Sequence, residues 1–234
     1  AEVDPPYGHH NAVHFFDVNR DGRPEVLAGG CLLSADGELL WQHDLAEEMR
    51  TWPHAQHYDA CVVDFMAGDK DLDPTAFLMG GSAGAYVVNA LTGETRATHR
   101  IGHAQWCLKC KLRPDLPGSE VLTGTRWGNF GIMTLFSGLG ERLWSIQPDY
   151  VLQGTEPVQW RAKGPQHIWV NTSKQVFGLY DGWGRLRDPL APMRELYSMH
   201  TKQPCMVLRR TPEENDRLAI GAGNRWHVFQ AEDA

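Results

Sequence analysis

The chain has 234 residues, with 22 Lys plus Arg against 29 Asp plus Glu and a formal charge of −7. This length is sufficient to bury a substantial core, and the acidic balance argues against binding nucleic acid or an acidic membrane through a basic face. No stretch approaches the roughly 18 uninterrupted apolar residues that a membrane span needs. The 24 Gly, 14 Pro and 9 Trp residues favour an all-β fold with many turns.

Five segments of similar length share one pattern of short β-type runs bounded by Gly, Asp, Asn and Pro. The last hairpin of each of the first four carries a dipeptide suited to a tight turn: Asp36-Gly37, Thr92-Gly93, Leu139-Gly140 and Trp183-Gly184. Four strands in every 40 to 50 residues or so are typical of a β-propeller blade. The sequence therefore predicts a single β-propeller over residues 1–234, with about five four-stranded blades. The predicted blade ranges are 11–55, 56–102, 103–154, 155–199 and 200–234. Five blades could close a ring or belong to a larger propeller, and we favour the latter.

The five cysteines are an odd number, so they cannot all pair within the chain. When the repeats are aligned from His57, His103 and Thr201, a cysteine follows four residues later in each, at Cys61, Cys107 and Cys205. A free thiol can pack there as a small hydrophobe on the innermost strand. Cys107 and Cys110 form a C-x-x-C motif, but this spacing places them on opposite faces of a strand. The motif is therefore a weak signal for zinc.

The first repeat contains a candidate calcium loop. Asp17, Asn19, Asp21 and Glu25 place oxygen side chains at positions one, three, five and nine, with Gly22 at six. Calcium prefers several oxygen ligands, and alternate loop residues can face one ion. We expect calcium here, whereas the alternative is a polar hairpin folded by its Asp and Asn side chains without metal. A looser second site is possible in the next repeat, at Asp64, Asp69, Asp71 and Asp73.

Propeller topology predicts that the repeat starts and the loops between second and third strands share one rim. We expect the following residues at this rim: His10, Asn11, His57, Tyr58, His103, Gln105, Arg126, Trp127, Asn129, Glu156, Arg225 and Trp226. Histidine can exchange protons near neutrality, arginine can pair with carboxylates, and exposed tryptophan gives a flat surface for sugar rings. Each residue could instead be structural, as a hydrogen-bonded histidine or a tryptophan between blades.

Four sequence runs resemble propeller-type polysaccharide lyases of the rhamnogalacturonan lyase-like family and relatives that act on rhamnose–uronate linkages. They are the D-x-N-x-D-G-x-x-E loop, GHAQ at 102–105, LRPDLPGSEV at 112–121 and WGNFGIMTLFSGLGERLW at 127–144. The resemblance covers most of residues 8–149, and the GHAQ and RPDLPG runs are its most specific parts.

The resemblance implies β-elimination on a polysaccharide that contains uronic acid. A base removes the proton at C5 of the uronate, and negative charge developing on the carboxyl group must be neutralised. We expect His103 as base or acid, His57 as its partner and Arg126 on the carboxylate, while His10, Asn11, Trp127 and Asn129 would bind the sugar. The motif match supports His103 and Trp127 best; His57 and Arg126 rest mainly on topology.

Two other functions remain open. A non-catalytic, calcium-stabilised propeller could bind carbohydrate or protein partners, and a quinoprotein-type dehydrogenase could use Glu156 as its base. The preferred interpretation is a monomeric lyase whose partner is an acidic polysaccharide and not nucleic acid or a membrane. Loop calcium and a polymeric substrate both predict a secreted or periplasmic protein.

Overall fold

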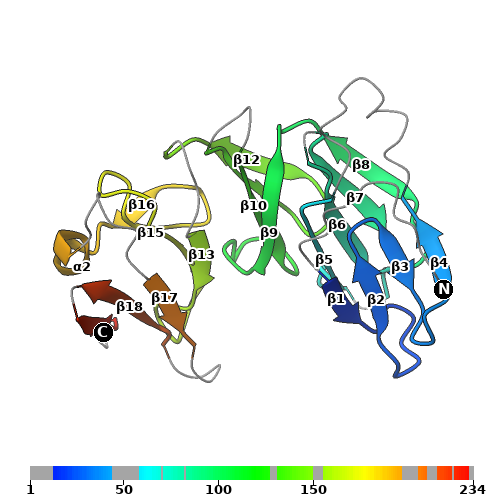
Figure 1. The fold of residues 1–234 in the computed structure, drawn as a ribbon, viewed down its shortest axis with the longest axis horizontal. Coiled ribbons are helices and arrows are strands. Elements are labelled where there is room, and N and C mark those ends of the chain that lie inside the picture. The colour runs from blue at the N-terminus through cyan, green and yellow to red at the C-terminus, as the bar shows by residue number, and fades with distance from the viewer. Residues whose placement is uncertain are drawn as a thin grey trace. The chain divides into compact units, whose positions relative to one another are not determined.

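The computed structural model describes residues 13–43, 58–69, 71–81, 83–126, 131–149, 155–196, 205–209, 215–222 and 224–231 (Figure 1). The chain divides into two compact units. Unit 1 comprises residues 1–109 and 116–147, and unit 2 comprises residues 110–115 and 148–234. No helix in the described ranges is long and apolar enough to cross a membrane.

Unit 1 contains three four-stranded antiparallel sheets, and in each the strands pair in chain order. Sheet one consists of β1 (Val13–Phe16), β2 (Glu25–Ala28), β3 (Cys31–Leu33) and β4 (Leu39–Gln42). Sheet two consists of β5 (Ala60–Asp64), β6 (Thr75–Met79), β7 (Ala85–Asn89) and β8 (Thr95–His99). Sheet three consists of β9 (Ala104–Cys110), β10 (Glu120–Thr125), β11 (Met133–Phe136) and β12 (Arg142–Ile146).

Unit 2 contains two further sheets and one short helix. Sheet four consists of β13 (Thr155–Val158), β14 (His167–Val170), β15 (Gly178–Tyr180) and β16 (Leu186–Asp188). The helix α2 (Ala191–Leu196) leads to sheet five, which consists of β17 (Cys205–Leu208), β18 (Arg217–Ala222) and β19 (Arg225–Phe229). The all-β propeller prediction is confirmed. For sheet five, the described residues supply three strands.

The four-stranded sheets repeat one structural detail, a register shift between their third and fourth strands. The shift lies at Leu32/Leu33, Val87/Val88, Leu135/Phe136 and Leu179/Tyr180. A β-bulge bends and twists a strand locally, so the outer hairpins of these four sheets share one irregularity. The repeated turn dipeptides thus belong to units that also share backbone geometry.

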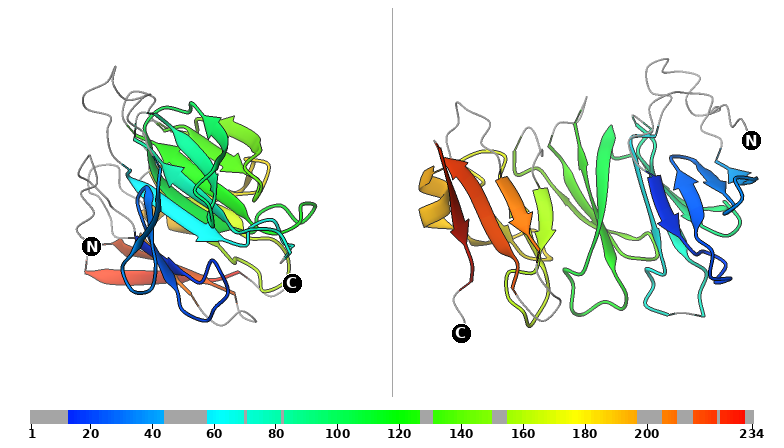
Figure 2. Two further views of the ribbon diagram at one scale, coloured as in Figure 1. Left: turned by 90° about the vertical axis from the view of Figure 1, so that its right-hand side faces the viewer. Right: turned by 60° about the horizontal axis from the view of Figure 1, so that its bottom comes forward.

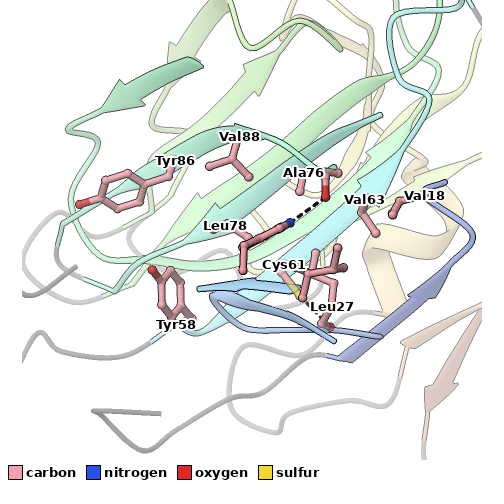
Figure 3. Close-up of a cluster of buried hydrophobic side chains, with 12 residues drawn as sticks. Val18, Leu27, Tyr58, Cys61, Val63, Ala76, Leu78, Tyr86 and Val88 are labelled. Atoms are coloured by element: carbon pink, nitrogen blue, oxygen red, sulfur yellow. Dashed lines mark hydrogen bonds between the residues drawn. The ribbon is translucent and has the colours of Figure 1, made fainter. Parts of the chain in front are cut away.

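Sheets one and two pack face to face across a cluster of buried apolar side chains, shown in close-up in Figure 3. Leu27 and Cys61 face each other there, with the Cys61 thiol 3.8 Å from the Leu27 carbonyl oxygen. Trp41 from β4 donates its indole N–H to the Ala90 carbonyl at 2.9 Å. Its ring lies against Gly93, where a Cβ atom would come within 2.8 Å of the indole. A glycine is thus needed at this turn both for its φ of 74° and for close approach of the tryptophan.

Sheets two and three stack in the same way (Figure 2). Phe77 and Phe136 meet in this second core, with ring centroids 5.8 Å apart. His99 at the end of β8 lies 2.7 Å from the Gly140 carbonyl through its Nε2 atom. The last strand of one sheet therefore binds the outer turn of the next sheet, as Trp41 does at Ala90.

All five cysteines are free. Cys61, Cys107 and Cys205 lie on the first strands β5, β9 and β17. Burial raises the pKa of the Cys61 and Cys205 thiols to about 11, so both are protonated and unreactive near neutral pH.

Candidate functional site

The starts of β5 and β9 and the end of β10 lie together along one edge of unit 1, which we call the unit 1 rim. Tyr58, just before β5, packs over Gly30 so closely that a Cβ atom there would overlap its ring. The backbone N–H of Ala104 donates to the Gly81 carbonyl at 3.2 Å. Repeat starts and turns between second and third strands therefore meet, which is the arrangement that places candidate site residues close together.

A buried carboxylate and a histidine form the centre of this rim. The Nε2 atom of His103 lies 2.8 Å from Oδ2 of Asp59, and the two side chains are 9% and 4% exposed. Gln105 donates its amide N–H to the other carboxylate oxygen, Oδ1, at 3.1 Å. The backbone N–H of Asp59 is itself bonded to the Met79 carbonyl at 2.9 Å. A hydrogen bond from Gln105 holds one carboxylate oxygen, and the close contact at the other places the carboxylate where it can orient the imidazole ring.

Arg126 follows β10 directly and is half-buried. Its backbone N–H donates to the His103 carbonyl at 3.0 Å, so two of the three predicted catalytic residues are neighbours. The third, His57, lies outside the described residues, as do the predicted sugar-binding residues His10, Asn11, Trp127 and Asn129.

Asp59 is the residue that reasoning from the sequence missed. It directly follows the predicted His57 and Tyr58 and directly precedes an apolar strand. An acidic residue at the edge of a buried strand needs a polar partner. This requirement could have identified Asp59 as a candidate site residue from the sequence. The identity of that partner, His103 in the next repeat, depends on how sheets two and three pack.

The candidate calcium loop joins β1 and β2 and is closed by its own side chains. Asp17 accepts the backbone N–H groups of Asp21 and Gly22 at 3.1 and 2.9 Å. The amide nitrogen of Asn19 lies 3.1 Å from Asp21 Oδ2 and 3.0 Å from Glu25 Oε1. Glu25 is 2% exposed and its second oxygen, Oε2, accepts the Val18 backbone N–H at 2.9 Å. The side chains of this loop supply oxygen atoms, the donor type that calcium prefers.

Across the described residues, no three His, Cys, Asp or Glu side chains converge to hold a metal ion. The amide of Asn19 bridges the Asp21 and Glu25 carboxylates instead. In the looser loop of sheet two, Asp64 is paired with the ammonium group of Lys109. Asp73 there accepts the Asn89 amide at 2.7 Å. A second calcium ion would need the carboxylates of Asp64 and Asp73. In this structure they are already paired with Lys109 and Asn89.

The remaining predicted rim residues lie in unit 2. Glu156 on β13 lies 3.8 Å from the guanidinium of Arg209, and its side chain is 41% exposed. Trp226 is 50% exposed on β19, and Arg225 precedes it. Glu156, the base of the dehydrogenase alternative, is thus a partly exposed carboxylate near an arginine.

Comparisons with known proteins support the fold. No family model matches the sequence, and no curated protein matches it. Among solved structures, the chain is similar to the rhamnogalacturonan lyase YesW, with 13% identity and a TM-score of 0.57 over 94% of this chain and 35% of that chain. It is also similar to the Bacillus licheniformis rhamnogalacturonan lyase PL11, with 13% identity and a TM-score of 0.56 over 95% of this chain and 35% of that chain. BBS1N, solved in complex with ARL6DN, is similar with 13% identity and a TM-score of 0.56 over 96% of this chain and 66% of that chain.

These similarities establish a propeller fold. At 13% identity they do not assign the chain to a family. The chain spans 35% of the length of the two lyases.

Proposed function

We propose that the chain contributes the catalytic rim of a lyase that cleaves an acidic, uronate-containing polysaccharide by β-elimination. The observation that carries the proposal is the pairing of His103 with buried Asp59 beside Arg126. A histidine held by a carboxylate is suited to accept a proton, and an adjacent arginine is suited to bind a uronate carboxyl group. The solved lyases with this fold, and the sequence runs that resemble them, add support.

In the proposed reaction, His103 removes the proton from C5 of the uronate. The electrons of the broken C–H bond form a double bond between C5 and C4, and the bond from C4 to the glycosidic oxygen breaks. That oxygen takes a proton from an acid, for which His57 is the candidate. Arg126 neutralises the charge that develops on the carboxyl group. Asp59 acts through His103 as a positioning residue, because its contact with Nε2 leaves Nδ1 as the proton acceptor.

We further propose that Asp17, Asn19, Asp21 and Glu25 bind calcium. The ion would supply charge neutralisation and rigidity to the β1–β2 loop. Hydrogen bonds from Asn19 already hold two of the carboxylates close together. A secreted or periplasmic location follows from the polymeric substrate and remains part of the proposal.

The test is the ultraviolet absorbance of the unsaturated uronate product after incubation with acidic polysaccharides. We expect signal with the protein, and loss of signal in His103→Ala with folding intact. His227→Ala on β19 of unit 2 is the matched control and should retain activity, because His227 is not among the residues of the unit 1 rim. Absence of product from every uronate polymer would refute lyase activity for this chain.

A second candidate is a non-catalytic propeller that binds carbohydrate or protein. The observation in its favour is the 9% exposure of the His103 side chain, which leaves little of the ring accessible to a substrate. In that case His103→Ala would leave polymer binding unchanged, and no unsaturated product would form.

A further inference from the structure

Unit 2 contains a cavity of about 390 Å³ beside the start of α2. Trp160, Met193 and Phe229 supply apolar walls, and Arg161, Asp188 and Gln230 supply polar groups. The volume lies within the range of about 300 to 1,000 Å³ common for small-ligand sites. The cavity involves none of the residues placed at the unit 1 rim.

The walls of this cavity are held in place. The backbone N–H of Gln159 donates to the Asp216 carboxylate at 2.8 Å, and the backbone N–H of Asp216 donates to the Gln159 carbonyl at 2.8 Å. These two bonds fix the segment before Trp160. On the opposite side, Leu190 has a φ of 46°, a left-handed conformation that leucine rarely adopts. The Asp188 carboxylate accepts the Leu190 backbone N–H at 2.8 Å and maintains this turn. Backbone strain of this kind persists where surrounding structure enforces it and is common at ligand sites.

The polar groups of the cavity differ in what they can bind. Arg161 is exposed and, within the described part of the chain, forms no ion pair with a carboxylate. Asp188 uses Oδ1 for Leu190, which leaves Oδ2 able to accept a hydroxyl group. Gln230 is exposed and can both donate and accept. A guanidinium, a carboxylate and an amide beside two aromatic side chains match a ligand with a carboxylate, several hydroxyls and an apolar C–H face.

We infer that this cavity is a second carbohydrate site, which binds uronate sugar through Arg161 and neighbouring hydroxyls through Asp188 and Gln230. The choice of an acidic sugar rests on the proposed function, whereas the location rests on the cavity itself. The site would anchor a polysaccharide chain on unit 2 without taking part in its cleavage.

The test is calorimetric titration with digalacturonate and with 4-linked galactobiose, which has the same rings without carboxylates. Wild-type protein should bind digalacturonate more tightly, and Arg161→Gln should weaken that binding by about tenfold or more, as expected for a lost charged hydrogen bond. Arg185→Gln is the control, because Arg185 is exposed on the turn before β16 and does not line the cavity. Arg126→Gln, at the unit 1 rim, should leave a binding event that Arg161→Gln removes.

The outcomes separate this inference from the lyase proposal. An unchanged titration in Arg161→Gln, or equal affinity for the two disaccharides, would overturn the second site even if the polymer is cleaved. Carboxylate-dependent binding that Arg161→Gln abolishes, in a protein that yields no unsaturated product, would support the second site and refute the lyase.

Discussion

Substitution of Asp59 by asparagine isolates the charge of the central carboxylate while preserving its shape. The introduced amide keeps an oxygen for the Gln105 side chain, but its NH2 group then faces Nε2 of His103. His103 can retain a hydrogen bond in this contact only by accepting it at Nε2, which places the ring proton on Nδ1. The substitution therefore replaces a buried contact with a charged carboxylate by a neutral one and removes the proposed proton acceptor.

The magnitude follows from burial. Both side chains are more than nine-tenths buried, so solvent screens the contact little. Hydrogen bonds to charged groups contribute roughly 1.5 to 3 kcal/mol and neutral ones roughly 1 kcal/mol. We expect Asp59→Asn to lower the free energy of unfolding by about 1 kcal/mol. Asp59→Ala should lower it by about 3 kcal/mol, because it removes the whole polar group that faces the buried Nε2 atom.

Activity should respond far more strongly than stability. Loss of a general base typically lowers turnover by about 100-fold or more, so Asp59→Asn should be folded and nearly inactive. Urea unfolding and the rate of ultraviolet absorbance change measure the two effects separately. Gln105→Ala, which removes the other bond to the carboxylate, should retain most of the turnover. Wild-type turnover in Asp59→Asn would refute the positioning role of the carboxylate.

Three further predictions concern the loop, pH and the packing of sheets. Calcium should raise the Tm of the protein, a chelator should reverse the rise, and Asp21→Asn should reduce it; a Tm insensitive to calcium would contradict the site. Burial lowers the pKa of His167 below 6.5, so the unfolded state binds its proton at higher pH than the folded state. The free energy of unfolding should therefore fall as pH decreases from about 7 to about 5. In urea titrations, His167→Gln should reduce the dependence of this free energy on pH. An unchanged pH dependence in the variant would contradict the role of His167. Trp41→Phe removes the 2.9 Å bond to the buried Ala90 carbonyl, and should lower the free energy of unfolding by about 1 to 3 kcal/mol; Leu40→Ala, at a 49% exposed position, is the control and should cost less.

The repeat pattern allowed much of the fold to be predicted. Turn dipeptides such as Thr92-Gly93 and Leu139-Gly140 mark outer hairpins because their glycines adopt positive φ, at 74° and 92°. These are local requirements, which short runs of residues express directly. In the last predicted repeat, residues 200–234, the described residues supply three strands.

The site shows the opposite balance. The sequence by itself determined that His103 begins a repeat, that Arg126 follows a second strand, and that the loop at Asp17 is rich in oxygen ligands. Only the tertiary structure decided that Asp59, which lies 44 positions before His103 in the sequence, is the partner of its ring. Local sequence patterns report backbone preferences within one hairpin, whereas side chains on different sheets meet only through the stacking of those sheets. That stacking depends on the fit of whole apolar faces, such as those carrying Phe77 and Phe136.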